Sequence, residues 1–207
     1  LKVILGGHKT KYALIHECAE LEYFLYKKKI DIDFLNALDI DSLVECLFSG
    51  HYLNRRIFSH PIPNLIFTRD IAVCIGNTIL ITWSKKDVRK RENILAKYIF
   101  NFHPFFRDMN FYDFHNRHPE LSIEGGDILV FDKKRICIGI SERTPLESIN
   151  EIAHLFFTEG FETIIAIDLP KKRALMHLDT IFTRISNNEV LVFPPILDQN
   201  HLNTIYL

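Results

Sequence analysis

The chain repeats one pattern three times: an acidic residue followed by two apolar segments that are joined by a short turn. The apolar segments span residues 71–83, 128–140 and 180–193, and they turn at Gly76-Asn77, Lys133-Lys134 and Asn187-Asn188. Glycine and asparagine readily adopt the positive φ angles that tight hairpin turns need. The pattern therefore predicts three β-hairpins. Because their strands are apolar on both faces, helices are expected to cover the sheets, which indicates an α/β fold.

Helical segments are predicted after the first two hairpins. One is expected to begin near Ser84 and to end before Pro104. The other has Thr144 as its expected cap and Pro145 as its first residue, and it ends at Gly160. Each repeat is thus a hairpin followed by a helix.

The acids that precede the hairpins are Asp70, Asp127 and Asp179. If the repeated modules are related by rotation, their hairpin entries face a common axis. The three acids are then expected to converge on one cavity.

The first 60 residues have a different texture. Residues 11–50 carry apolar side chains at helical spacing, and a short helix is predicted from Ser42 to Phe48, capped by Asp41 and ended by Gly50. A linker is expected from residue 51 to 63, followed by a short strand from Asn64 to Thr68. The predicted domains are therefore a helical segment with its linker at 1–60 and a catalytic domain at 61–207.

Composition excludes several classes of protein. Hydrophobic residues make up 47% of the chain and charged residues 25%, which favours a packed core. The net charge is -1 and no long basic stretch is present, so nucleic acid is not an expected partner. No apolar run approaches the roughly 18 residues of a membrane span. The four cysteines form no close pair, which favours buried, reduced thiols and a cytoplasmic protein.

Five short motifs occur in a fixed order. They are Pro63–Asp70, Val88–Glu92, Ile123–Asp127, Ile140–Thr144 and Met176–Thr180. Each is weak evidence by itself, but in this order and spacing they resemble the arginine deiminases, which hydrolyse arginine to citrulline and ammonia. The resemblance extends from residue 61 to about 195.

The resemblance implies a five-bladed α/β propeller, the pentein fold. This chain is expected to encode an incomplete propeller of about three modules, with part of a helical insertion at its N-terminus. It also implies a nucleophilic cysteine in a glycine-rich segment near the family's C-terminus. None of the four cysteines here lies in such a segment, and the first residue is not methionine, so a copy truncated at both ends is expected.

The resemblance also assigns roles that suit the chemistry of a guanidinium. This planar cation is bound by carboxylates that accept forked hydrogen bonds, and Asp70 and Asp179 match the family's residues for that role. Glu124 and His177 match the family's proton-handling pair. An imidazole suits that role, because it titrates near neutral pH. The predicted catalytic residues are therefore Asp70, Glu124, His177 and Asp179.

The remaining family positions are predicted to bind substrate. Arg89 and Arg143 match the residues that hold the α-carboxylate. Asn64, Phe67 and Asp127 match other pocket positions. The glycines at 125 and 126 would let the backbone approach a ligand closely.

Simpler explanations exist for single residues. A lone aspartate at a strand end commonly caps a turn, and a lone histidine in an apolar strand is commonly a core residue. Arg89 lies in a basic run that also suits a solvated helix face. His177, Asp179 and Glu124 do not form a clear set of metal ligands, so neither a metal nor a cofactor is predicted.

Several functions remain open. The leading prediction is a truncated arginine deiminase that is inactive alone and takes L-arginine as its substrate or ligand. The alternatives are one half of a split enzyme completed by a C-terminal chain, and a non-catalytic guanidinium-binding or structural remnant. Within the enzymes, agmatine deiminase and methylarginine hydrolase compete, and the stretch from Ser141 to Thr144 favours arginine deiminase.

Overall fold

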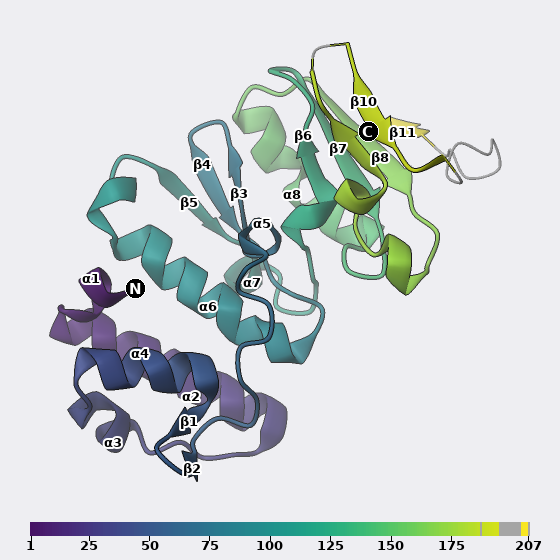
Figure 1. Cartoon of the computed structure of the whole chain (residues 1–207). Helices are drawn as coiled ribbons and strands as arrows, with labels where there is room; N and C mark the ends of the chain where they lie inside the picture. Colours follow the sequence, from purple (N-terminus) through teal and green to yellow (C-terminus); the bar gives the residue numbers. More distant parts are fainter. Residues whose placement is uncertain (187, 195–203, 207) are drawn as a thin grey trace. The chain divides into compact units, whose positions relative to one another are not determined.

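The computed structural model describes residues 1–186, 188–194 and 204–206. The chain forms two compact units that are interleaved in sequence. Unit 1 contains Leu1–Phe67 and Lys86–Phe111, and unit 2 contains Thr68–Lys85 and the chain from Tyr112 onward (Figure 1). The units do not follow the boundary near residue 60 that was expected between the two domains. That division into domains stays a prediction.

Unit 1 is mainly helical. Its elements are α1 (Lys2–Leu5), α2 (His8–Tyr26), α3 (Ile32–Ala37), α4 (Ile40–Ser49), β1 (His51–Tyr52), β2 (Arg55–Arg56), α6 (Asp87–Phe102) and η1 (Pro104–Phe106). Buried side chains of α2 such as Leu14 and Ile15, of α4 such as Leu43, and of α6 such as Leu95 form the core. Apolar residues at helical spacing thus place one face of each helix inside the unit.

Helix α4 begins and ends at residues that commonly cap helices, but its first cap is not the predicted one. The cap is Asp39 rather than Asp41, since the Asp39 carboxylate accepts a hydrogen bond from the Ser42 amide at 2.9 Å. Gly50 ends the helix, as predicted, in the left-handed conformation with φ of 76°. The segment after it, expected to be an irregular linker, contains the short β1–β2 hairpin.

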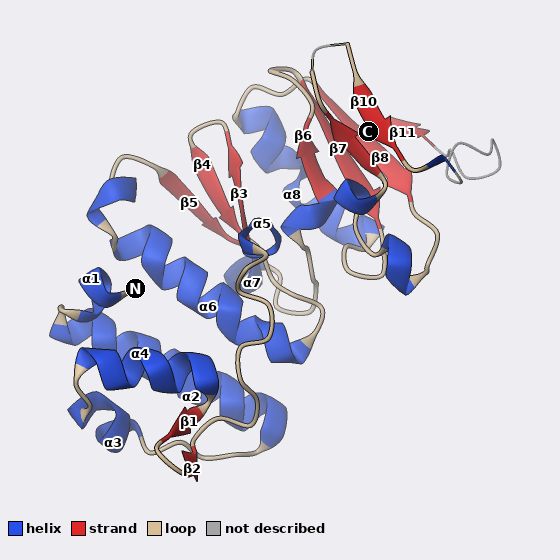
Figure 2. Cartoon of the chain, in the orientation of Figure 1, coloured by secondary structure: helices blue, strands red, loops and turns tan. Residues whose placement is uncertain are grey.

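Unit 2 holds the strand-rich part of the chain (Figure 2). Its elements are α5 (Thr68–Ile71), β3 (Ala72–Ile75), β4 (Thr78–Ile81), α7 (Phe114–Arg117), η2 (Gly125–Asp127), β6 (Ile128–Val130), β7 (Arg135–Ile140), α8 (Leu146–Thr158), β8 (Thr163–Asp168), η3 (Arg173–Leu175), η4 (Leu178–Thr180), β9 (Phe182–Arg184), β10 (Val190–Val192) and β11 (Thr204–Tyr206). The chain passes from unit 1 to unit 2 within β5 (Asn110–Asp113), which extends the β3–β4 hairpin to the strand order β3-β4-β5.

The second repeat is a complete βαβ arrangement. Strands β6 and β7 pair as an antiparallel hairpin, α8 follows, and β8 then pairs parallel to β7 in the sheet order β11-β8-β7-β6. Helix α8 packs against β8. Parallel strands need such a crossover. A sheet covered by a helix has apolar strand interiors, and here Ile136, Ile138 and Ile164 are fully buried.

The predicted hairpins are confirmed within the described residues. The β3–β4 pairing closes between Ile75 and Thr78, and the β6–β7 pairing closes between Val130 and Ile136. Strands β9 and β10 form the third antiparallel pair. The predicted turn residue Asn187 lies outside the described residues.

The predictions for Asn64–Thr68 and for Thr144 were also wrong. Asn64–Thr68 is not a strand, because the Phe67 amide donates back to the Asn64 carbonyl and the chain turns into α5. Thr144 does not cap α8, whose cap residue is Pro145. The Thr144 hydroxyl instead accepts a hydrogen bond from the Glu124 amide, a contact 20 residues away in sequence.

The cysteines are all free thiols, as predicted, but only three are buried. Cys18, Cys46 and Cys137 lie in the cores of their units, whereas Cys74 on β3 is exposed. The expectation that Cys74 is a core residue was therefore wrong. Within the described residues, no helix has the length and apolar character that crossing a membrane requires.

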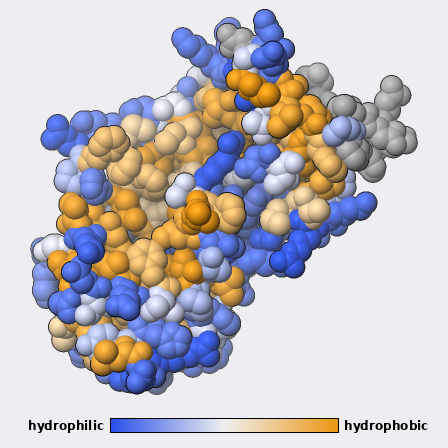
Figure 3. Space-filling model, in the orientation of Figure 1, coloured by the Kyte–Doolittle hydropathy of each residue, from blue (hydrophilic) through white to orange (hydrophobic). Residues whose placement is uncertain are grey.

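The β9–β10 pair carries exposed apolar side chains, and orange surface lies beside β10 in Figure 3. Ile185, Val190, Leu191 and Phe193 are each at least 44% exposed. The apolar segment 163–169 is not an open sheet edge, because β8 pairs with β7 on one side and with β11 on the other.

We expect this exposed apolar surface to cause association that depends on protein concentration, since large bare apolar patches are rare on monomers. Replacement of Leu191 by lysine should shift the sedimentation profile toward monomer. Replacement of Leu53 by lysine, an 83% exposed leucine of unit 1, adds the same charge elsewhere and should not. Equal effects of both variants would show that charge, not the β10 surface, controls association.

Candidate active site

Three short helical turns bring the repeated acids together in unit 2. Asp70 lies in α5, Asp127 in η2 and Asp179 in η4, and each turn leads directly into the first strand of a hairpin. Both α5 and η4 lie against η2. The repeat predicted in the sequence therefore recurs in space at the level of these turns.

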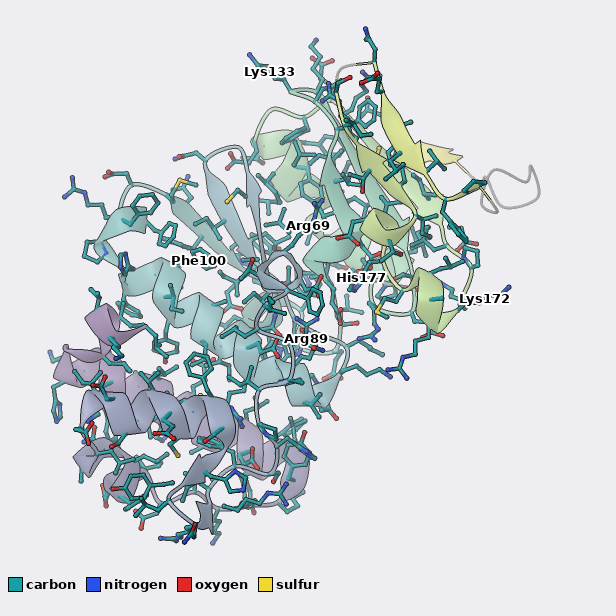
Figure 4. The ribbon with its side chains drawn as sticks, viewed as in Figure 1. Arg69, Arg89, Phe100, Lys133, Lys172 and His177 are labelled. Atoms are coloured by element: carbon teal, nitrogen blue, oxygen red, sulfur yellow. The ribbon has the colours of Figure 1, made fainter. Side chains whose placement is uncertain are left out.

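His177 and Glu124 form a buried pair at the centre of this cluster. His177 immediately precedes η4, and Glu124 immediately precedes η2. The His177 Nε2 atom lies 2.8 Å from Glu124 Oε2, and its Nδ1 atom lies 3.6 Å from Asp70 Oδ1. The imidazole is thus held between two carboxylates. Figure 4 labels His177, together with Arg69 of α5.

Gly126 makes this arrangement possible. A Cβ atom at position 126 would lie 2.6 Å from His177 Nδ1 and 2.9 Å from Asp70 Oδ1. A Cβ atom at Gly125 would lie 2.0 Å from the Arg69 carbonyl oxygen. Gly125 therefore allows α5 to pack against η2, and Gly126 allows the His177 ring to do so. The absence of a side chain at these positions has a packing role as well as the predicted role in ligand approach.

Glu124 is held from several directions. Its Oε1 atom accepts a hydrogen bond from the Lys85 amide at 3.0 Å and one from Arg143 Nη1 at 3.3 Å. The Arg143 side chain is 12% exposed, and its buried Nε atom has no hydrogen-bond partner among the described residues. The Nε–H group of Arg143 is therefore a hydrogen-bond donor beside the cluster that a ligand can use.

The Asp127 carboxylate accepts hydrogen bonds from two other segments of unit 2. Its Oδ2 atom accepts a hydrogen bond from the Ser141 hydroxyl at 2.7 Å, and its Oδ1 atom accepts one from the Leu178 amide at 3.0 Å. Burial raises the pKa of Asp127 to about 6, although these hydrogen bonds and His177 oppose the rise. Both carboxylate oxygens of Asp127 thus accept hydrogen bonds from the protein. A substrate-binding role for Asp127 stays a prediction.

Asp179 faces a basic neighbour. Its Oδ2 atom lies 3.6 Å from Arg69 Nε, and Arg69 also donates to the Ile128 carbonyl at 3.1 Å. Burial raises the pKa of Asp179, while His177 and Arg69 counteract the rise. The Asp179 carboxylate is about one quarter exposed, so a small cationic ligand can reach it.

The electrostatics favour an ion pair between His177 and Glu124. Burial opposes protonation of His177, but the hydrogen bond to Glu124 and the nearby charges of Asp127, Asp70 and Glu124 together raise its pKa. Burial likewise opposes ionisation of Glu124, but the hydrogen bond from His177 and the charges of His177 and Arg143 lower its pKa. The imidazole is therefore protonated at a pH where a free imidazole is partly neutral.

The same cluster offers atoms to a metal ion. Ligand atoms of Asp70, Glu124 and His177 lie within 4.8 Å of one another. However, the two carboxylates face opposite ring nitrogens, and one ion can be bound by only one of these nitrogens. The arrangement suits proton transfer through the imidazole better than binding of one ion by all three groups.

Three predicted substrate residues belong to unit 1, so they are described apart from the cluster. Arg89 in α6 is buried, and its Nε and Nη2 atoms lie 3.0 and 2.9 Å from Glu92 Oε2. The other oxygen of Glu92 accepts a hydrogen bond from the Asn64 amide. Phe67 is 57% exposed. Arg89 is therefore not on a solvated helix face, and its local partners fix it beside Asn64.

Sequence reasoning missed the residues that support the site. Ser141, Thr144, Arg69 and Glu92 all contact a predicted site residue, and all lie inside the quoted motifs. Their presence in those motifs was a usable signal. Their partners could not be assigned, because the contacts join segments distant in sequence.

Solved structures with a similar fold bind arginine-related molecules. DDAH from Pseudomonas aeruginosa, in complex with citrulline, has a TM-score of 0.52 at 20% identity, over 68% of this chain and 51% of that chain. The N-terminal domain of ArgZ, an arginine dihydrolase of cyanobacteria, has a TM-score of 0.53 at 23% identity, over 69% of this chain and 49% of that one. The chain thus has the mixed α/β fold of the pentein enzymes.

Sequence comparison is more specific. A family model described as arginine deiminase matches residues 27–207. The arginine deiminase of Borreliella afzelii is 39% identical over 171 residues, which cover 74% of this chain and 42% of that protein. That of Clostridium perfringens is 41% identical over 140 residues, which cover 66% and 34%. The chain belongs to the arginine deiminase family, and its matched part covers between about one third and two fifths of the length of these relatives.

Proposed function

We propose that this chain supplies the guanidinium-binding and proton-transfer part of an arginine deiminase site. The observation that carries the proposal is the buried imidazole of His177, held 2.8 Å from Glu124 and 3.6 Å from Asp70. Arg143 beside this pair and Asp179 on the neighbouring turn complete the set. Membership of the arginine deiminase family makes arginine the substrate that suits these groups best.

The chemistry follows from the charges. Asp70 and Asp179 would accept hydrogen bonds from the substrate guanidinium. A thiolate attacks the guanidino carbon, and His177 gives its proton to the departing nitrogen, which leaves as ammonia. The neutral imidazole then takes one proton from water, and the water oxygen attacks the same carbon. The carbon–sulfur bond breaks to release the thiolate and citrulline, and the second proton of the water is taken up by the released ammonia. Glu124 keeps His177 charged before the first step.

Arg143 is proposed to bind the substrate α-carboxylate, because its buried Nε atom has no hydrogen-bond partner within the described part of the chain. Asn64, Phe67, Arg89 and Asp127 match substrate-binding positions of the arginine deiminase family, and we propose a role in substrate binding for each of them on that resemblance.

The thiolate is proposed to come from outside residues 1–207. Burial raises the pKa of Cys137 to about 11, of Cys46 to about 11 and of Cys18 to about 12, so these thiols are poor nucleophiles. Cys74 is exposed, in a groove of about 580 Å³ whose described lining includes Arg69 and Val73 but neither Glu124 nor His177. The split-enzyme alternative, in which a second chain adds the nucleophile and the remaining modules of the propeller, stays part of this proposal.

We expect L-arginine to bind the chain through Asp70 and Asp179. Replacement of either residue by asparagine should weaken binding by roughly 1.5–3 kcal/mol, the usual loss for a hydrogen bond to a charged group. Calorimetric titration with L-arginine measures the change. Asp168→Asn, an exposed carboxylate in the same unit, is the matched control and should leave the affinity unchanged.

Binding that is equal in all four proteins would argue against the guanidinium site. Binding that tolerates Asp70→Asn but not Asp179→Asn would restrict the site to η4. Retained binding without turnover in the presence of a cysteine-containing partner would favour the non-catalytic alternative.

We expect the 207-residue polypeptide alone to form no citrulline. Loss of one member of a catalytic unit lowers the rate by about 10⁴- to 10⁶-fold. A colorimetric citrulline assay at high protein concentration measures this, with Cys74→Ala as the companion variant. Rapid turnover that Cys74→Ala abolishes would place the nucleophile on β3 and contradict the proposal.

A further inference from the structure

A buried path of hydrogen bonds connects the two members of the proton-transfer pair through Thr144, Ser141 and Asp127, none of which takes part in the proposed proton transfer. The Glu124 amide donates to Thr144 Oγ1 at 3.1 Å, and the Thr144 amide donates to Ser141 Oγ at 3.1 Å. The Ser141 hydroxyl donates to Asp127 Oδ2, and Asp127 Oδ1 accepts from the Leu178 amide. All five residues are buried.

The hydrogen-bond path ends at two backbone amides, and each of them belongs to, or follows directly after, a member of the proton-transfer pair. One end is the amide of Glu124 itself. The other is Leu178, the residue that follows His177. The separation of the two side chains is therefore controlled by a path of side-chain and backbone hydrogen bonds, in addition to their direct contact of 2.8 Å.

Ser141 is the branch point of this path. Its oxygen accepts hydrogen bonds from the Arg143 amide at 2.9 Å and from the Thr144 amide, while its hydrogen goes to Asp127. A serine hydroxyl has one donor and two acceptor sites, and all three are filled. No apolar residue can replace these bonds, and each unpaired buried group carries a desolvation penalty.

We infer that Ser141 is a positioning residue, which sets the relative placement of Glu124, Arg143 and His177 through the loop that follows β7. The inference deepens the proposed function, because the catalytic meaning of the pair rests on that function. The hydrogen-bond geometry itself does not depend on arginine.

The inference has a measurable electrostatic consequence. Loss of the Ser141 hydroxyl removes the donor to Asp127, so the pKa of this buried carboxyl rises further and its negative charge near His177 is reduced. The other charged groups that face His177 are Glu124, Asp70 and Asp179, and they remain. The pKa of His177 should consequently fall.

The test is a pH titration of His177 by NMR in the 207-residue chain, with the resonance assigned from its absence in His177→Asn. Ser141→Ala should lower the His177 pKa by about half a unit or more, since nearby charges commonly shift a pKa by that amount. Ser148→Ala is the matched control. Its hydroxyl is equally buried and donates to the Ser122 carbonyl at 2.7 Å, outside the path. The control should leave His177 unchanged.

Two further variants separate positioning from general stability. Ser141→Thr keeps the hydroxyl and should restore the His177 titration. Ser141→Cys, a weak donor of similar shape, should give an intermediate shift, and it replaces the alanine variant if that protein does not fold. Unfolding in urea, followed through the single tryptophan Trp83, gives the stability of unit 2 in each case.

An unchanged His177 titration in Ser141→Ala or Ser141→Cys, with a stability loss like that of Ser148→Ala, would overturn the inference. Failure of the proposed function would instead appear as absent arginine binding in the unmodified chain. The titration contains no arginine, so the two failures are distinguishable.

Discussion

Replacement of Gly126 by alanine is expected to separate His177 from Glu124 and Asp70. The added Cβ atom would lie 2.6 Å from His177 Nδ1, 2.8 Å from its Cγ and 2.9 Å from Asp70 Oδ1. The ring is buried and pinned by its contact with Glu124, so it cannot turn aside at little cost. Overpacking of this kind costs about 1–3 kcal/mol of stability. The effect on the site should be more severe than this loss of stability, because the His177 ring must leave its position between Glu124 and Asp70.

Two measurements report the change. The His177 pKa, now raised by its carboxylate neighbours, should return toward that of a free imidazole. Binding of L-arginine should become undetectable by calorimetry. Gly160→Ala is the control in the same unit, since Gly160 has a φ of 91° but no atom within 4 Å of the added Cβ. It should lower stability without moving the His177 titration. A normal titration in Gly126→Ala would contradict the close packing of η2 against His177.

Replacement of Glu124 by glutamine is expected to remove about 3–5 kcal/mol of stability at mildly acid pH, the usual cost of breaking a buried ion pair from one side. Glutamine keeps the shape of the side chain but leaves the charges of His177 and Arg143 without their common partner. The direction of the pH dependence follows from linkage. Glu124 has a lowered pKa, so its contribution is present above the ordinary carboxyl range and is lost as pH falls through the lowered value.

His177 has a raised pKa, so its contribution is complete below about 6.5 and is lost as pH rises through the raised value. The stability difference between the unmodified chain and Glu124→Gln should therefore be largest between about pH 4.5 and 6.5 and smaller on both sides. Urea unfolding followed by Trp83 fluorescence measures the difference in unit 2. Taking the difference between two proteins removes the separate effect of Asp127, whose raised pKa destabilises the fold as pH rises toward 6.

Glu159→Gln provides the matched control. Glu159 also accepts hydrogen bonds within unit 2, but its donors, the Asn77 amide and the Thr78 hydroxyl, belong to the β3–β4 turn and not to the His177 cluster. It should lower stability without a maximum between pH 4.5 and 6.5. A flat difference for Glu124→Gln would show that the pair is not ionised in the folded chain.

Much of the architecture could be predicted from local sequence. Gly76-Asn77 favours a two-residue turn, and the apolar segments around it have strand propensity, so the β3–β4 hairpin needed no distant partner to be recognised. Helix α6 was predicted close to its observed bounds, because Pro104 follows it and apolar residues recur along it. Boundaries were less certain where two acids compete, as with Asp39 and Asp41 at the start of α4.

The candidate site could be predicted as a list of residues but not as a network. Motifs singled out Asp70, Glu124, His177 and Arg143, and the structure brings these four together in unit 2. The orientation of each side chain was not predictable. Asp127 occupies the same place in its repeat as Asp70 does, yet its carboxylate is bound to Ser141 and Leu178.

Local sequence specified the three long hairpins, the helix after each of the first two, the acid that precedes each hairpin, and the family to which the chain belongs. These properties depend on neighbours a few residues apart. Three features depend on tertiary contacts: Thr144 accepts a hydrogen bond from Glu124 instead of capping α8, Glu92 binds Arg89, and Gly126 leaves room for the His177 ring. The contact between His177 and Glu124 joins residues that are 53 positions apart. Local sequence favours no single orientation of these side chains, and packing between distant segments selects the one that is observed.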